Sequence, residues 1–270
     1  MKCLSTEKID MDRLDFLFSC EVGALAACRG FPSIVQLLDY SRDEAFIVME
    51  LVSPSLTGVM KDENGVTRCH PENEVRHLVR QLLAGAAGMH RVGLMHRDIK
   101  PDNVLVDAHG NLKLCDLGIS RAFSDVPPYT NPVVARKYRA PELLLGSVDY
   151  DSRIDAWAIG CIMAELLAGG MPFRGSSVKE QLGEVLSVLG TDDIREWSGC
   201  PDRLPGGCGP TSFLRDMFPS PEMHSTLIAG RPTLSEAGFE VLSGFLRCNP
   251  EKRMSPARAL KHRWFQPPEA

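Results

Sequence analysis

The sequence predicts an α+β protein in which a small, strand-containing lobe precedes a larger, mainly helical one. The first observation is a pair of β-branched runs, "SIVQLLDYS" and "EAFIVMELV", which flank a turn at residues 41–44. The second is the amphipathic pattern "ENEVRHLVRQLLAGAAGMHRVG", which is typical of a helix packed on a core. The third is the mainly helical patterning beyond residue 142. We therefore divide the chain into a small lobe, residues 1–52, and a large lobe, residues 53–270.

The remaining elements follow from local signals taken in chain order. "MDRLDFLFSCEVGALAACRG" has a helical apolar rhythm, with Gly30 at its end and Pro32 beyond it as stop signals. The long amphipathic helix closes at Gly93. "NVLVD" and "LKLCD" are separated by "AHGN", where Gly110–Asn111 supplies a tight turn, so they predict a β-hairpin. The run "AWAIGCIMAELLAGG" is too short to span a membrane and contains Glu165, which favours a buried core helix.

Composition narrows the classes of protein. The chain has 270 residues, of which 44% are hydrophobic and 24% charged, so it can bury a substantial core. Its formal net charge of -5 gives no basic surplus for phosphate backbones, and we expect neither a nucleic-acid nor a membrane partner. The 9 cysteines form no CxxC pair. With no apolar signal segment, this usage favours a reducing, intracellular setting, the nucleus or the cytoplasm.

Three segments carry the chemistry. "HRDIKPDN" precedes the predicted hairpin, "CDLG" follows it, and "YRAPE" lies further on. Singly each is weak, because a lone Asp98 or Asp116 is most often a loop carboxylate and a lone Asn103 a turn residue. In this order around a hairpin they match the set H-R-D-x-x-x-x-N, D-F-G and A-P-E. The sequence thus resembles the eukaryotic protein kinases, in their cyclin-dependent-kinase-like branch, over nearly its whole length.

The resemblance implies a bilobal protein-kinase fold and the transfer of phosphate from ATP, with Mg²⁺, to protein Ser or Thr. It implies that Asp98 orients the substrate hydroxyl and accepts its proton, and that Lys100 reaches the transferring phosphate. Asn103 and Asp116 would supply hard oxygen ligands for magnesium. Leu117 stands in the place of the Phe of D-F-G, an apolar exchange that leaves the metal ligand unchanged.

The resemblance also implies a nucleotide site. Met49 would stand at the back of the cleft, where it is equally well a core methionine. The backbone of Glu50 and Val52 would meet the adenine edge, and Leu105 would lie in the adenine pocket. Away from the cleft, Asp155 would tie down the catalytic loop, and Arg253 would pair with Glu142, which are structural roles.

The branch assignment rests on "YTNPVVARKYRAPELLLG" and on "SSVKEQLGEVLSVLGTDD". An Arg at the place of Arg139 favours proline directly after the phosphorylated Ser or Thr in this branch. Thr130 lies where these kinases carry an activating phosphothreonine, whose charge Arg97 and Arg121 would pair. The alternative for Thr130 is an unmodified loop threonine.

Three departures from the family pattern stand out. Cys20 replaces an arginine that would complete the phosphothreonine cluster, which leaves recognition by a cyclin-like activator open. Ala135 replaces a Thr whose hydroxyl would bridge Asp98 and Lys100. No glycine-rich phosphate loop precedes Lys2, so the chain resembles a kinase truncated before the ATP lysine. By its spacing from Glu21 we interpret Lys2 as that lysine, against the alternative of a solvated terminal lysine.

We therefore expect a cyclin-dependent-kinase-like Ser/Thr protein kinase that acts on Ser/Thr-Pro sites in cell-cycle or transcription regulation. The alternative is a pseudokinase or interaction protein with the same fold and little activity. The missing phosphate loop, Cys20 and Ala135 favour that alternative. A small-molecule kinase is disfavoured because the full "HRDIKPDN" with "YRAPE" is typical of kinases with protein substrates.

Overall fold

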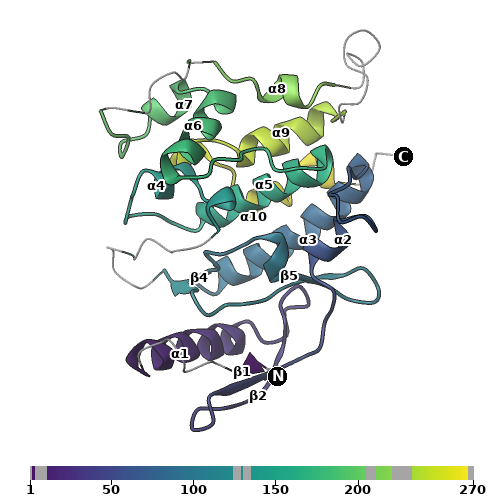
Figure 1. Ribbon diagram of the computed structural model, residues 1–270, viewed down its shortest axis with the longest axis vertical. Helices are drawn as coiled ribbons and strands as arrows, with labels where there is room; N and C mark the ends of the chain where they lie inside the picture. Colours follow the sequence, from purple (N-terminus) through teal and green to yellow (C-terminus); the bar gives the residue numbers. More distant parts are fainter. Residues whose placement is uncertain are drawn as a thin grey trace.

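The computed structural model describes residues 2–3, 11–123, 129, 135–202, 204, 209, 211–220 and 233–266, with the backbone alone given for residues 2–3 and 11–14. A small lobe of one helix and one sheet lies at the N-terminal end, and a larger helical lobe lies beyond it (Figure 1). This arrangement confirms the predicted α+β class. Among the described residues, no helix has both the length and the apolar character needed to cross a membrane.

The described residues of the small lobe form three antiparallel strands, in the order β1-β3-β2, and one helix. Its elements are β1 (Lys2–Cys3), α1 (Met11–Ala27), β2 (Leu37–Ser41) and β3 (Phe46–Met49). Lys2 pairs with Ile47, which places the first strand on the open side of β3. Gly30 adopts a φ of 84°, a left-handed conformation that suits glycine, so the chain turns soon after α1 as the stop signal predicts. Phe18 and Leu25 are buried between helix and sheet.

The lobes are joined by a segment that leads into α2 (Leu56–Val59) and α3 (Glu72–Arg91). α3 buries the apolar stripe that its sequence predicts, including Val75, Leu82 and Met89. The predicted hairpin forms from β5 (Val104–Val106) and β6 (Leu112–Leu114), with Gly110 at a φ of 80° in its turn. A further pair is formed by β4 (Leu94–Met95) and β7 (Arg121–Ala122).

The core of the large lobe is α5 (Arg153–Ala168), whose residues from Ile154 to Leu167 are all buried. Its side chains pack on α3 and α9. Gly169 ends the helix with a φ of 66°. Within the described part of the lobe, the further helices are α4 (Pro141–Leu144), α6 (Val178–Leu189), α7 (Asp192–Arg195), α8 (Leu214–Met217), α9 (Glu236–Phe245) and α10 (Pro256–Ala259). Short 3-10 turns complete it: η1 (Pro101–Asn103), η2 (Arg136–Tyr138), η4 (Pro250–Lys252) and η5 (Arg263–Phe265).

Candidate active site

The catalytic loop runs from β4 to η1, and Asp155 of α5 holds its backbone by hydrogen bonds. The Asp155 carboxylate accepts hydrogen bonds of 2.9 Å from the backbone amides of His96 and Arg97, and it lies 2.8 Å from Nε2 of His90. Burial alone would raise the pKa of Asp155, but the hydrogen bond and charge of His90 hold it below its ordinary value. These bonds confirm the predicted anchoring, and they support the left-handed φ of 73° at Arg97.

Asp98, the predicted base, is fixed by two neighbours on the same loop. Lys100 Nζ lies 2.7 Å from Oδ2 of Asp98, and Asn103 Nδ2 donates to the same oxygen at 2.9 Å. No described residue forms a hydrogen bond to Oδ1. This leaves one carboxylate oxygen for an incoming hydroxyl, as a general base requires.

Asn103 and Asp116 meet at one end of the hairpin. The backbone amide of Cys115 donates to the backbone carbonyl of Asn103 at 3.0 Å, so the residue that follows Cys115 lies beside the end of η1. Asp116 is exposed and has a φ of 62°, a conformation that Asp tolerates better than most residues. Leu117 is fully buried, so the leucine that stands in the place of the Phe of D-F-G is part of the core.

This donor set fits the magnesium ion that the family implies. The amide nitrogen of Asn103 is committed to Asp98, which leaves the amide oxygen as its metal donor. A carboxylate oxygen of Asp116 would be the second protein ligand, and few protein oxygens are what Mg²⁺ prefers when phosphate and water complete its shell. When bound, the ion would neutralise charge on the phosphates of ATP.

The adenine edge is predicted at residues 50–52, and the backbone there fits it. The Glu50 amide is committed to the carbonyl of Gln36 at 3.0 Å, whereas no described residue forms a hydrogen bond to the Val52 amide. The Glu50 side chain bonds Lys113 Nζ and the Gln36 amide, both at 2.8 Å, which rigidifies the strand end. The sequence analysis did not predict these contacts of Glu50 with Lys113 and Gln36, because the three residues are distant in the chain.

The other predicted nucleotide residues surround this edge. Met49 is half-buried at the end of β3 and packs against the core. Leu105, also half-buried, pairs with Lys113 and forms an isolated bridge with Ser55. The positions of Met49 and Leu105 are consistent with residues that form the floor of a nucleotide pocket, and equally with ordinary core packing.

Glu21 lies on α1 and is 2% exposed. Gly118, the last residue of "CDLG", has no Cβ, and a Cβ built there would lie 3.4 Å from Oε2 of Glu21. The Glu21 carboxylate therefore adjoins this segment. Lys2 lies on β1 of the same lobe's sheet, and its side chain is outside the described residues. The predicted Lys2–Glu21 pair therefore stays a prediction, supported by the strand position of Lys2.

The structure brings Arg97 and Arg121 close enough to repel each other, whereas Thr130 lies outside the described residues. Burial lowers the pKa of Arg97, Tyr150 counteracts this by charge and hydrogen bonding, and Arg121 lowers it further. The guanidinium carbon of Arg121 is 4.6 Å from the ring centroid of Phe16 on α1. No pattern in the sequence indicates this aromatic contact, which links Arg121, after the "CDLG" segment, to α1.

Arg139 lines a small cavity together with Asp98, Tyr138 and Asp155. Burial lowers the pKa of Arg139, as does the nearby Arg136, whereas the charge of Asp98 raises it. The predicted substrate residue thus adjoins the predicted base. Ala135 precedes η2, and its methyl side chain has no hydroxyl that could bridge Asp98 and Lys100.

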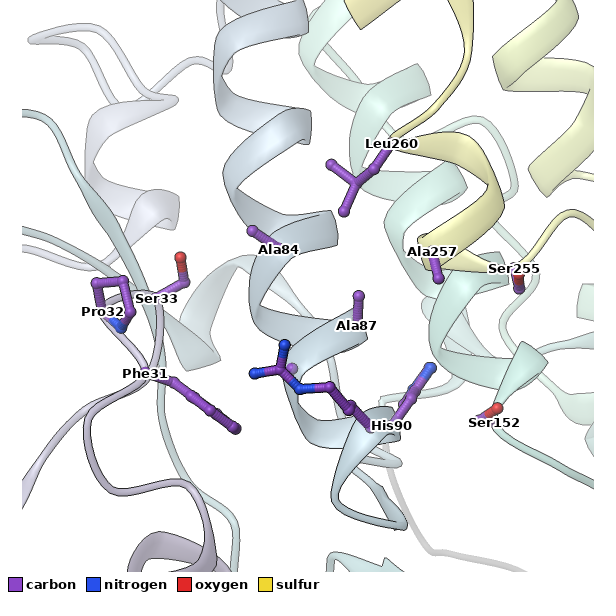
Figure 2. Close-up of a pocket in the computed structure, with 12 residues that line it drawn as sticks. Phe31, Pro32, Ser33, Ala84, Ala87, His90, Ser152, Ser255, Ala257 and Leu260 are labelled. Atoms are coloured by element: carbon purple, nitrogen blue, oxygen red, sulfur yellow. The ribbon is translucent and has the colours of Figure 1, made fainter.

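A second, larger cavity of about 640 Å³ lies on another side of α3. Figure 2 shows it between the loop at Phe31–Ser33, the α3 residues Ala84 and Ala87, and Leu260 after α10. None of the predicted catalytic or nucleotide residues lines it. The chemistry therefore resides at the catalytic loop and not in this cavity.

The fold and this site define a protein kinase, and the comparisons with known proteins agree. A model of the protein kinase domain matches residues 1–265, so the chain belongs to that family. It is 46% identical over 271 residues to "Putative cyclin-dependent kinase F-2" of Oryza sativa subsp. japonica, covering 93% of this chain and 78% of that protein. It is 36% identical over 237 residues to cyclin-dependent kinase D-1 of Arabidopsis thaliana, covering 87% and 56%.

A third relative is cyclin-dependent kinase G-2 of Oryza sativa subsp. indica, 42% identical over 245 residues. This chain covers 33% of that longer protein. Together these matches show that the chain is a cyclin-dependent-kinase-like Ser/Thr protein kinase.

Proposed function

We propose that this chain transfers the γ-phosphate of ATP, with Mg²⁺, to Ser or Thr residues followed by proline in protein substrates. The observation that carries the proposal is the geometry of Asp98, held at Oδ2 by Lys100 and Asn103 while Oδ1 is left to a substrate hydroxyl. Arg139 beside it supports the proline preference. We propose a role in cell-cycle or transcription control, in the nucleus or cytoplasm.

In this mechanism the residues position and polarise more than they react. Asp98 Oδ1 orients the hydroxyl and takes its proton, and Asn103 keeps the carboxylate in that rotamer through its amide nitrogen. Lys100 lies within reach of the same reaction centre, so its ammonium balances the charge of Asp98 before phosphate arrives. Val52 and Glu50 would orient the base of the nucleotide through their backbone groups.

The test compares a Ser-Pro peptide with a matched Ser-Ala peptide, using ATP and Mg²⁺, and includes Asp98→Asn as the inactive control. The proposal predicts phosphorylation of the Ser-Pro peptide at a rate several-fold above Ser-Ala. Equal rates would reject the Arg139 assignment. A purified chain that binds ATP and peptide but transfers no phosphate would favour the pseudokinase alternative.

We also propose that a protein activator contacts α1, as relatives named cyclin-dependent kinases suggest. Phe16 supports this, because it is 44% exposed while it contacts Arg121 of the activation segment. A partner that covered Phe16 would also fix Arg121. Substitution Phe16→Ala should then weaken activation by an added cyclin and leave the activity without cyclin unchanged within twofold.

A further inference from the structure

The cavity of about 640 Å³ has no part in the chemistry proposed above. Figure 2 shows α3 as its floor, between a wall formed by the loop at residues 31–33 and a wall formed by the segment around α10. Its volume falls within the range of about 300–1,000 Å³ that is typical of clefts that bind ligands. The surface is mainly apolar, with Phe31 on one wall and Leu260 on the other.

The space exists because α3 carries the run "AGAAG" at residues 84–88. Ala84 and Ala87 line the cavity with methyl groups alone. Gly88 has no side chain, and a Cβ built there would lie 3.2 Å from the ring of Phe31. Larger residues in this run would close the cavity, so the opening follows from the composition of this chain.

The charged groups at the cavity are basic. Among the described residues no carboxylate lines it, whereas Arg91 does, and its guanidinium carbon lies 5.1 Å from the ring centroid of Phe31. On the other wall, Arg258 and Lys261 are exposed, and each is next in the chain to a lining residue of the α10 segment. Cations therefore border the apolar floor on both sides.

The described part of the chain does not neutralise these three cations, because none of them forms an ion pair within it. Carboxylates of the neighbouring segments are engaged elsewhere. Asp151 lies 3.1 Å from Arg153, and Glu240 lies 3.1 Å from His262 and 2.7 Å from Arg263. The cavity thus keeps a positive potential in a chain whose formal net charge is -5.

We propose that this cavity docks a segment of a partner protein in which apolar side chains are flanked by Asp or Glu. The apolar side chains would fill the space over residues 84–88 as buried anchors. Their acidic neighbours would meet Arg91 on one side and Arg258 and Lys261 on the other. Cations on both sides favour a segment with several carboxylates over a small anion, which would meet one side alone. Three cations are too few to hold a nucleic-acid backbone.

The experiment selects random peptides displayed on phage against the purified chain and, in parallel, against Ala84→Trp. Ala84 is exposed, so the indole fills the cavity without entering the core. Asn73→Trp, at an exposed position of α3 outside the cavity, is the matched control. Both variants should melt within about 2 °C of the native chain. Peptides that bind the native chain and Asn73→Trp but not Ala84→Trp should be acidic and contain a large apolar residue.

The charge is tested with one such peptide, labelled and measured by fluorescence anisotropy. Arg91→Glu should weaken its binding by about tenfold or more, because like charges then face each other. Lys179→Glu, at an exposed cation of α6, should leave the affinity within about twofold. Exchanging the Asp and Glu of the peptide for Asn and Gln should weaken binding as Arg91→Glu does. This arm also stands if Ala84→Trp fails to fold, since Arg91 is exposed.

Three outcomes would overturn the proposal. Every selected peptide could bind Ala84→Trp as well as the native chain, or the peptides that depend on the cavity could be neutral or basic. Light scattering could also show a native dimer that Ala84→Trp converts to monomers, which would assign the cavity to a second copy of the chain. All these measurements are made without ATP, so their result is independent of whether the chain transfers phosphate.

Discussion

Asn103 donates its side-chain amide to Asp98 twice, to the backbone carbonyl and to Oδ2, each at 2.9 Å. One residue thereby fixes both the loop and the rotamer of the candidate base. Its amide oxygen is left for a metal ion, so the same side chain couples the substrate side of the site to the magnesium side.

Asp98→Asn should abolish measurable peptide phosphorylation, with a loss of roughly 10²–10⁴-fold, because the amide cannot accept the hydroxyl proton. Asp98 is half-buried in the cleft and contributes no core packing, so the melting temperature should stay within about 2 °C. A radiometric peptide assay and a melting curve measure the two effects. Activity within tenfold of the native chain would contradict the base assignment.

Asp116→Asn should remove most of the magnesium dependence of nucleotide binding while the fold is retained. Asparagine tolerates the φ of 62° at this position and keeps an oxygen but loses the charge. The readout is the thermal shift produced by ATP with and without Mg²⁺, since a ligand stabilises the state that it binds. Asp151→Asn, at an exposed carboxylate away from the cleft, is the control. An unchanged magnesium dependence would remove Asp116 from the ligand set.

Breaking the buried pair between Glu142 and Arg253 should cost stability and not chemistry. Nη1 and Nη2 of Arg253 each lie 2.7 Å from a carboxylate oxygen, and the guanidinium is fully buried. Arg253→Met leaves a buried, uncompensated carboxylate and should lower the free energy of unfolding by about 3–5 kcal/mol. Urea unfolding measures this loss.

The double variant Arg253→Met with Glu142→Gln tests whether the lost stability comes from the unpaired charge of Glu142. Because the second substitution removes the orphaned charge, the double variant should lose less stability than the sum of the two single variants. Additive losses would show that packing, and not the charge pair, accounts for the effect.

The buried thiols should make stability fall at alkaline pH. Burial raises the pKa of Cys28 to about 11 and raises those of Cys161 and Cys248 further. A raised pKa favours the neutral thiol in the folded state, so this contribution is complete below the unfolded pKa of about 8.5 and declines as pH rises toward the folded value. Iodoacetamide at pH 8.5 should label exposed Cys69 first and these three thiols only on unfolding. Equal labelling rates in the folded chain would contradict the prediction.

Lys2→Met should weaken ATP binding if Lys2 is the nucleotide lysine. Its strand pairs with β3 at Ile47, in the sheet whose strand β2 contacts the helix that carries Glu21. Lys8→Met serves as the charge-matched control. ATP affinity measured by calorimetry should fall for the first variant alone, and equal affinities would leave Lys2 an ordinary terminal lysine.

Local patterns predicted much of the fold. The hairpin followed from Gly110 in its turn, and α3 and α5 followed from apolar periodicity and length. The pairing of β4 with β7 was not predicted, because two-residue strands leave no periodic signal.

For the site, the motif spacing predicted Asp98, Lys100 and Asn103, which the structure brings together by hydrogen bonds. It missed their supports: Lys113 against Glu50, Thr57 against Asp102, and the Tyr138–Glu165 bond. Each joins segments that the fold alone brings together, so a single sequence carries no trace of them. Glu165 gave the one readable signal, a lone carboxylate within an apolar run that needs a polar partner once buried.

The hold of Asp155 on the catalytic loop has a consequence for how the chain could lose activity. The backbone amides of His96 and Arg97 donate to Asp155 of the central helix of the large lobe, so these contacts of the loop do not involve the small sheet. A variant that no longer bound nucleotide would still present an ordered catalytic loop to which phosphoacceptor peptides could bind. Such a variant would be a decoy, sequestering substrates from active kinases, and its phenotype would be dominant instead of silent.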